Sequence, residues 1–219
     1  MSFLDLYADH WPQLVKLLRR EPRLSPPLLI DSADRLANQP LRLFVVGQQT
    51  NSWYNDEVPI RKSPRAIEAL QAIYADFSLG LTHPSPFWQA VRELEHGLGV
   101  EPGHVLWGNL NRADFEAGRP PSELEAEMLR VFPLLPEELS AASPDLVVFF
   151  TGPAYDGLLS TALPDAVITP VRGFGRALAE VRHSSLPMRS FRAYHPKYLR
   201  LSGAWKKVLG AVVRRARDR

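Results

Sequence analysis

The sequence predicts an α/β protein with a three-layer αβα arrangement, in which helices cover both faces of a mostly parallel sheet of four to five strands. Short apolar runs that end near Gly or Asn alternate with segments whose apolar residues recur at helical spacing. Strands that alternate with helices indicate parallel pairing through crossover helices. The chain has 219 residues, of which 45% are hydrophobic and 23% charged, a balance typical of a globular protein. We therefore expect one domain over residues 1–219.

Five apolar runs supply the expected strands. The clearest is 145–152, where five apolar residues stand between Asp145 and Gly152. Continuous runs of this kind are typical of parallel strands that are buried on both faces. The remaining runs are 41–47, 103–109 and 190–194, together with a weaker one at 166–169.

Helical periodicity predicts most of the segments between these strands. The expected helices are 63–77, 87–98, 122–131 and 202–217. Apolar residues at helical spacing also fill the first 18 positions until a proline ends the pattern, and Asp31 or Ser32 is the expected cap of a second short helix. Residues 1–40 are therefore expected to form a helical extension that packs on the domain.

The composition excludes several classes of site. The chain has no Cys, which excludes disulfides, thiolate zinc sites, a Cys nucleophile and Cys-held iron–sulfur clusters. No His has a partner at metal-ligand spacing, and no glycine-rich phosphate loop is present, so we expect neither a metal nor a cofactor. No apolar stretch reaches 18 residues and the N-terminus lacks a signal-peptide pattern, so we expect a cytoplasmic protein without a membrane partner.

The charge is divided unevenly along the chain. Residues 1–171 carry 13 Lys and Arg against 22 Asp and Glu, whereas residues 172–219 carry 13 Lys and Arg against Glu180 and Asp218 alone. Most of the later cations are Arg, which suits bidentate phosphate contacts. A basic segment on an acidic body is a footprint of polyanion binding, although a solvated basic helix is the alternative.

Amide side chains follow the predicted strands at the edge where an open α/β sheet binds ligands. Gln48 and Gln49 follow the first strand, Asn109 ends the second and His195 follows the last. A carboxamide offers a donor beside an acceptor, which complements the edge of a nucleobase. An imidazole can donate a hydrogen bond to an oxygen that gains negative charge as a base departs.

These strand ends resemble motifs of the uracil-DNA glycosylase superfamily. Val46-Gly47-Gln48-Gln49-Thr50-Asn51 resembles the motif G-Q-D-P-Y-H, and Tyr194-His195-Pro196-Lys197-Tyr198-Leu199 resembles the H-P-S-P-L motif. The segments 105–109 and 146–154 resemble the strand ending in the base-reading Asn and the strand before a small-residue turn. His83-Pro84-Ser85-Pro86-Phe87-Trp88 is similar to the H-P-x-N-R-F-W segment of the mismatch-specific branch. The resemblance covers about residues 41–210.

The resemblance implies a role for each matching residue in a reaction that hydrolyses the N-glycosidic bond of a flipped base without a cofactor. Gly47 and Gln48 would lie against the base, Asn109 would bind its edge, and His195 would stabilise the departing anion. Aromatic side chains can stack on a base, and Phe77 is the first candidate for this contact, with Trp53 as the second.

The same resemblance implies a contact with DNA. Lys197, Tyr198 and Leu199 would form the loop that enters the duplex where the base leaves. Arg200 belongs to the Arg-rich segment that would meet phosphates. DNA, single- or double-stranded, is therefore the expected partner of a chain that we expect to be a monomer.

One position departs from the family pattern. The residue that activates water, Asp or Asn in the family, falls on Gln49, which can orient water but is not a base. Asn51 or Asp56 of the same loop is the candidate substitute.

The first hypothesis is therefore a cofactor-free DNA glycosylase. The alternatives are a catalytically inactive nucleic-acid-binding protein on the same fold and a hydrolase of small nucleosides, whose binding would barely change with salt.

Overall fold

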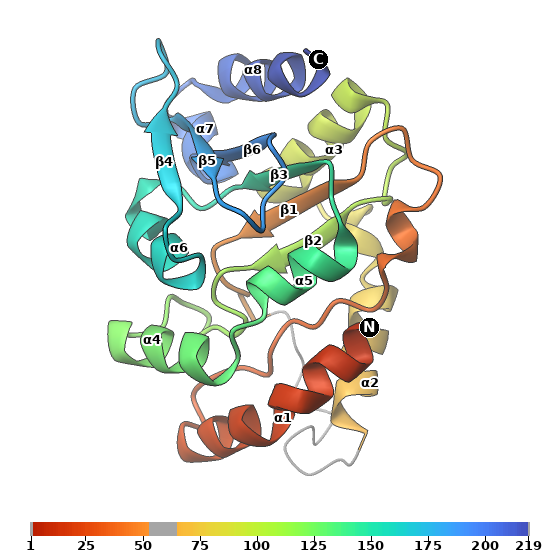
Figure 1. Ribbon diagram of the computed structural model, residues 1–219, viewed down its shortest axis with the longest axis vertical. Coiled ribbons are helices and arrows are strands. Elements are labelled where there is room, and N and C mark those ends of the chain that lie inside the picture. The colour runs from red at the N-terminus through yellow and green to blue at the C-terminus, as the bar shows by residue number, and fades with distance from the viewer. Residues whose placement is uncertain (1, 53–64, 219) are drawn as a thin grey trace.

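The computed structural model describes residues 2–52 and 65–218 and has the predicted α/β class (Figure 1). Within this part of the chain, six strands form one sheet in the order β2-β1-β3-β6-β5-β4. The strands are β1 (Leu43–Gly47), β2 (Leu106–Asn109), β3 (Leu146–Phe149), β4 (Val167–Pro170), β5 (Leu178–Arg182) and β6 (Ser190–Ala193). The first four strands of the sheet order are parallel to one another. The strand β5 is antiparallel to both of its neighbours, β6 and β4.

The sheet has six strands instead of the expected four to five, because β5 was not predicted from the sequence. In this strand the polar Glu180 and Arg182 alternate with the buried Ala179 and Val181. Such alternation is typical of an antiparallel strand with one solvated face, whereas the central parallel strands are buried throughout and stand out as apolar runs.

Eight α-helices occur in the described chain. They are α1 (Phe3–Arg20), α2 (Ala66–Asp76), α3 (Pro86–Leu98), α4 (Ser122–Val131), α5 (Leu135–Ala142), α6 (Asp156–Ala162), α7 (Pro196–Leu201) and α8 (Trp205–Arg217). Ser85 caps α3 by accepting a hydrogen bond from the N–H of Trp88, and Ser32 caps the short 3-10 helix Ala33–Leu36. The unpredicted helices α5, α6 and α7 are only six to eight residues long, too short for a clear helical period.

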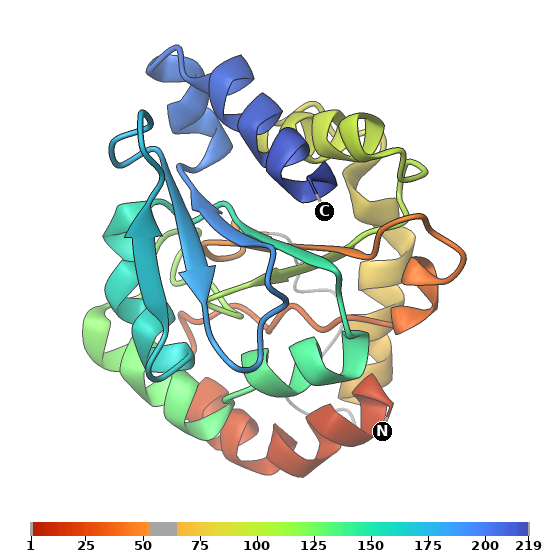
Figure 2. The ribbon, with the colours of Figure 1, turned by 45° about the horizontal axis from the view of Figure 1, so that its top comes forward.

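Helices on both faces of the sheet complete the three layers (Figures 1 and 2). The layer seen above the sheet in Figure 2 holds α3, α7 and α8, which pack against one another. The layer below it holds α1, α4 and α5.

The helix α1 belongs to the second layer and shares the main core. Its buried residues include Leu6, Tyr7, Leu14 and Leu18. The Tyr7 hydroxyl donates to the carboxylate of Glu138 in α5 (2.8 Å) and accepts from the backbone N–H of Ile30 (3.0 Å). This N-terminal helix is therefore packed on the sheet domain.

The hairpin of β4 and β5 places its tip at the edge where the parallel strands end. Residues 171–177 form this tip, and the backbone N–H of Tyr194, just after β6, donates to the carbonyl of Ala177 (3.0 Å). The hairpin tip thus adjoins the segment that carries His195.

Candidate functional site

The carboxyl ends of β1, β2, β3 and β6 bring the predicted site segments together. The N–H of Leu110 donates to the carbonyl of Gly47 (3.1 Å), and the N–H of Gly152 donates to the carbonyl of Ala193 (2.9 Å). These backbone bonds join the turns after neighbouring strands. We call the side chains gathered here the carboxyl-edge cluster, which consists of Gln48, Phe87, Asn109, Thr151 and His195.

Gly47 leaves room for two members of this cluster. It lies opposite Asn109 in the parallel pairing of β1 with β2. A Cβ atom at position 47 would lie 2.3 Å from the side-chain amide of Asn109 and 3.3 Å from the ring of Phe87. Only glycine therefore permits this close approach of strand and side chains.

Phe87 links this position to His195. Its ring lies 6.2 Å from the His195 ring, with 26° between the two planes. From the sequence, Phe87 belongs to the motif at 83–88 and is predicted to be a core residue. Its place in the second position of α3 gave no signal of this contact, because β6 and α3 are brought together only by the tertiary fold.

Asn109 is almost fully buried, with 2% of its surface exposed. In the orientation that satisfies both polar atoms, its nitrogen donates to the carbonyl of Gly108 (3.0 Å) and its oxygen accepts from the N–H of Thr50 (3.3 Å). A carboxamide has two N–H donors and two lone pairs, so one donor and one acceptor are left after these bonds.

The two glutamines after β1 each have an internal partner. The Gln48 amide donates to the carbonyl of Thr151 (2.7 Å), and the Gln49 carbonyl accepts from the hydroxyl of Tyr155. Burial raises the pKa of Tyr155 to about 12, so this hydroxyl keeps the proton that it donates. Thr151 is 1% exposed, and its own hydroxyl has no hydrogen-bond partner among the described residues.

An ionic network holds Tyr155 in place. The guanidinium of Arg119 lies 4.1 Å from the centre of the Tyr155 ring and donates to both carboxylate oxygens of Glu125 (2.7 and 2.9 Å). Glu125 also accepts from the amide of Asn111 (2.6 Å). The orientation of Gln49 is thus coupled to the segment after β2 through four other side chains.

Asp114 is a buried carboxylate that the sequence analysis missed. One oxygen accepts from the Thr50 hydroxyl (2.7 Å) and from the N–H of Ser52 (3.1 Å), and the other accepts from the N–H of Ala117 (2.9 Å). These bonds fix the backbone that follows Gln49. The segment 110–114 had no regular pattern, so only the spatial contact reveals this role.

His195 is half-buried and is held as a neutral ring. The backbone N–H of Lys197 donates to its Nδ1 (3.3 Å). Burial of the ring, together with the charge of Lys197, lowers the pKa of His195 from 6.5 to about 4. Because Nδ1 accepts a hydrogen bond, the proton of the neutral ring resides on Nε2, which can donate to a ligand.

Phe77, the first candidate for the stacking contact, does not join the cluster. The Phe77 ring packs against Trp88 (5.3 Å) and Trp107 (5.7 Å), and within residues 2–52 and 65–218 the Phe77 ring makes no contact with the His195 ring. Phe77 therefore belongs to a neighbouring aromatic group rather than to the site. Trp53 and Asp56 lie outside the described residues, and Asn51 is exposed.

The four residues expected to contact DNA form the helix α7 rather than a loop. Leu199 is 0% exposed, so its predicted entry into the duplex is wrong: the helical turn directs this side chain into the core. Lys197, Tyr198 and Arg200 are exposed, and the Arg200 guanidinium lies 4.7 Å from the centre of the Trp205 ring.

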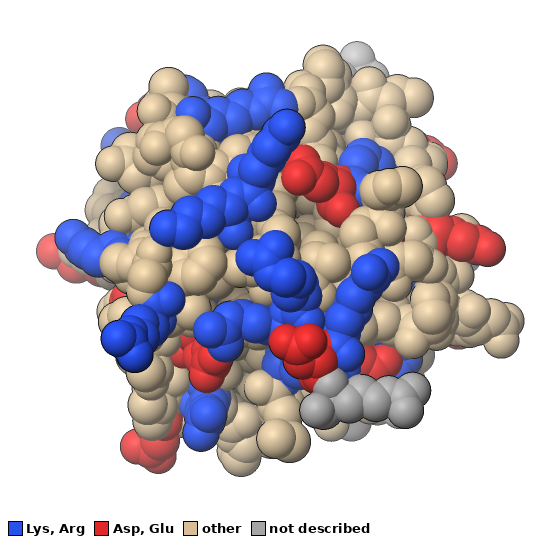
Figure 3. Space-filling view, turned by 90° about the horizontal axis from the view of Figure 1, so that it is seen from above, with Lys and Arg blue, Asp and Glu red and all other residues tan. Residues whose placement is uncertain are grey.

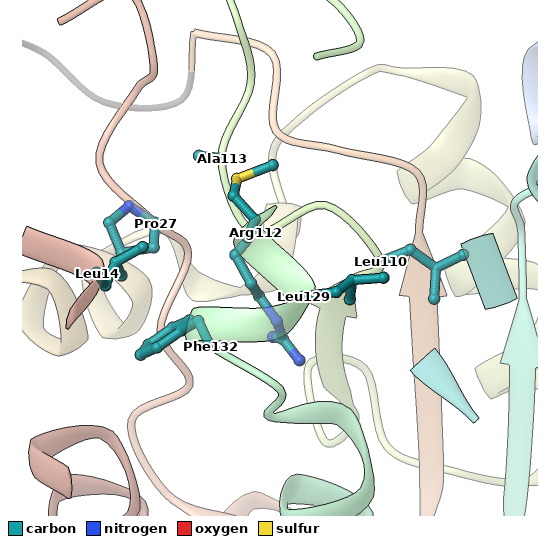
Figure 4. A pocket seen from close by; sticks show the side chains of 8 residues that line it. Leu14, Pro27, Leu110, Arg112, Ala113, Leu129 and Phe132 are labelled. Atoms are coloured by element: carbon teal, nitrogen blue, oxygen red, sulfur yellow. The ribbon is translucent and has the colours of Figure 1, made fainter. Parts of the chain in front are cut away.

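A small cavity between α1, α4 and the segment after β2 is too small to be a ligand site. It has a volume of about 10 Å³, enough for one water molecule at most (Figure 4). Its lining includes Leu14 of α1 and Arg112, whose guanidinium pairs with the buried Glu138. The described residues contain no group of three or more His, Asp or Glu side chains placed to hold a metal ion.

Comparison with known proteins adds no family assignment. No family model matches the chain, and no curated protein matches it significantly. Across residues 2–52 and 65–218, no helix combines the length and the apolar character needed to cross a membrane.

Proposed function

We propose that the carboxyl-edge cluster binds a nucleobase extruded from DNA and that the chain hydrolyses its N-glycosidic bond. The observation that carries this proposal is the state of His195. It is a neutral imidazole whose Nε2 donor has no hydrogen-bond partner among the described residues, and it lies beside the Phe87 ring at the edge where an open α/β sheet binds ligands. This donor matches an oxygen of a departing base anion.

The reaction requires one water molecule and a stabilised leaving group. The bond between the sugar C1′ and the base nitrogen breaks, the base takes the electron pair, and the water oxygen bonds to C1′. The proton released by water neutralises the base anion. Gln49 would orient that water through its amide N–H groups, because the Tyr155 hydroxyl occupies the amide oxygen.

A second candidate is a nucleic-acid-binding protein without catalytic activity. It is favoured by the internal hydrogen bonds of Gln48, Gln49 and Asn109, each of which already has a partner. The position expected to activate water also carries an amide instead of a carboxylate. In this case the extruded base would be bound and not released.

We also propose a cellular location and an oligomeric state for the protein. We take the protein to act on DNA in the cytoplasm as a monomer. Size-exclusion chromatography with light scattering tests the second of these points, since a dimer would double the mass of 24.7 kDa.

A base-release assay separates the two candidates. Oligonucleotides that contain uracil, hypoxanthine or xanthine, in single- and double-stranded form, are incubated with the protein and with its His195→Ala variant. Loss of one donor to a developing oxyanion lowers rates by about 200-fold, which corresponds to about 3 kcal/mol. The exposed His96 supplies a matched control, and His96→Ala should retain the full rate.

The possible outcomes have distinct meanings. Base release that is unchanged in His195→Ala would show that the assigned role of this residue is wrong. Oligonucleotide binding without release by the unaltered protein would favour the second candidate. Hydrolysis of free nucleosides with no preference for a polynucleotide would instead indicate a small-molecule hydrolase.

A further inference from the structure

A cleft of about 360 Å³ separates the tip of the β4–β5 hairpin from α8. Its lining residues are Phe174, Ala211, Arg214, Arg215 and Asp218. This volume falls within the range of small-ligand sites in proteins. The cleft is distinct from the carboxyl-edge cluster, since the two share no lining residue.

The hairpin tip is shaped to present Phe174 to α8. Gly173 and Gly175 flank this residue with φ angles of +85° and +54°, which glycine adopts without strain. The Lys207 side chain of α8 donates to the carbonyl of Gly173 (2.8 Å), and its ammonium lies 5.0 Å from the centre of the Phe174 ring. The tip is thus fixed against the helix while the ring remains partly exposed.

Cations predominate around this cleft. Figure 3 shows Lys and Arg side chains gathered on the face seen from above, which is the side of α8 in Figure 1. Glu180 pairs with Arg215 (3.0 Å) and also lies 3.7 Å from Arg182. Arg214 is exposed and forms no ion pair with any described residue.

The dipole of α8 explains the position of only some of these cations. Arg214, Arg215 and Arg217 occupy the last turn of α8, where the helix dipole favours cations. Arg172 and Arg176 are exposed residues of the hairpin tip; neither lines the cleft, but each is two residues from Phe174, which does. The dipole of α8 does not account for these two, so the hairpin tip and α8 are two separate elements that carry exposed cations.

We propose that the cleft and the hairpin tip bind the phosphate backbone of DNA, with Phe174 as an apolar face for a sugar or base. This inference rests on the proposed function for the identity of the polyanion. The hairpin tip adjoins the site, because Ala177 pairs with Tyr194 and His195 is the next residue. A strand whose base occupies the carboxyl-edge cluster can therefore continue towards the cleft.

The test compares two double variants of the full chain by fluorescence anisotropy with a labelled oligonucleotide over a range of salt concentrations. Arg172→Gln/Arg214→Gln removes one exposed cation from the hairpin tip and one from the α8 wall of the cleft. Arg20→Gln/Arg130→Gln is the matched control, because it removes two exposed arginines near α4, at the end of the molecule far from α8 (Figure 1).

We expect the cleft variant to bind about tenfold more weakly at low salt. Its plot of log affinity against log salt should lose about 1.5 units of slope, since each phosphate contact contributes about 0.7–0.9. The control should match the unaltered protein. Equal affinity and slope in the cleft variant and the control would overturn the proposal.

Further arms separate this inference from its alternatives. The binding comparison does not require base release: if the unaltered protein binds the oligonucleotide but releases no base, the proposed function fails, while the weaker binding of the cleft variant still supports this inference. Competition by inorganic phosphate beyond that of chloride at equal ionic strength would indicate a small-anion site and overturn the proposal. Binding to phosphatidylserine vesicles that depends on these arginines, with oligonucleotide binding intact, would also overturn it.

Discussion

Among single residues, His195 combines a defined position beside Phe87 with an unusual protonation state. Its Nδ1 accepts from the backbone of α7, its ring lies against Phe87, and its pKa is lowered to about 4 by burial and by Lys197. A neutral ring donates one hydrogen bond without bringing a charge into the site. In the proposed reaction this donor would stabilise the negative charge that develops on the base as the glycosidic bond breaks.

The lowered pKa of His195 makes a prediction about stability. The unfolded chain, with a His pKa of 6.5, binds more protons than the folded chain between pH 6.5 and 4, so folding is weakened as the pH falls through this range. The contribution lost between pH 7 and pH 5 is about 2 kcal/mol. Urea unfolding of the protein and of His195→Asn at both pH values should show this difference only in the unaltered protein.

Glu95 has the opposite effect and serves as the internal check. Burial raises its pKa to about 7, so the folded chain binds more protons than the unfolded chain between pH 4.5 and 7 and loses stability as the pH rises. Glu95→Gln should therefore steepen the loss of stability on acidification. A His195→Asn variant with the same pH profile as the unaltered protein would contradict the assigned protonation state.

Gly47 supplies a second prediction at this scale. In Gly47→Ala the new methyl group would overlap the Asn109 amide, and the resulting overpacking should cost about 1–3 kcal/mol of stability. Gly157→Ala is the control, because a Cβ there has no neighbour within 4 Å and alanine favours the helix α6. Thermal unfolding of both variants measures the difference. Equal melting temperatures would mean that Asn109 moves aside freely.

Among the elements, α1 and α5 are joined by a buried polar group that the sequence did not reveal. Arg112 and Glu138 form an ion pair, 6% and 0% exposed, and Tyr7 of α1 donates to the same carboxylate. Burial raises the pKa of Glu138, and the charge of Arg112 opposes that rise. The pair therefore depends on both partners being present.

This dependence can be tested by removing one partner or both. Arg112→Ala leaves a buried carboxylate without its cation and should lower the free energy of unfolding by about 3–5 kcal/mol. Arg112→Met/Glu138→Leu replaces both charges by apolar groups and should be far less destabilising. Urea denaturation gives both values. A double variant as unstable as the single one would show that the pair stabilises the fold beyond satisfying its own charges.

At the scale of the whole molecule, the N-terminal helix is part of the core and not an appendage. Leu14 of α1 is 1% exposed and is packed in the same hydrophobic core as the strands of the sheet. Charge is distributed on the same scale, with a basic C-terminal layer beside an acidic remainder. This basic layer is the surface to which we propose that DNA binds.

The role of α1 predicts a difference between its two faces. Leu14→Ala should cost about 2–5 kcal/mol and lower the single cooperative unfolding transition. Leu4→Ala, at a position that is 38% exposed, should cost less than about 0.5 kcal/mol. Calorimetry checks both values. A separate early transition in Leu14→Ala would show instead that α1 unfolds independently.

The sequence by itself determined the α/β class, the four parallel strands and the segments of the candidate site, because buried strands are read as apolar runs and their carboxyl ends follow in order. Gly47, Gln48, Asn109 and His195 were identified in this way. Tertiary structure alone decided that Phe87 meets His195, that Asp114 holds the backbone at Thr50, and that Leu199 is directed into the core. These contacts join residues that are far apart in the chain or depend on the direction of one helical turn. A pattern of neighbouring residues predicts neither of these.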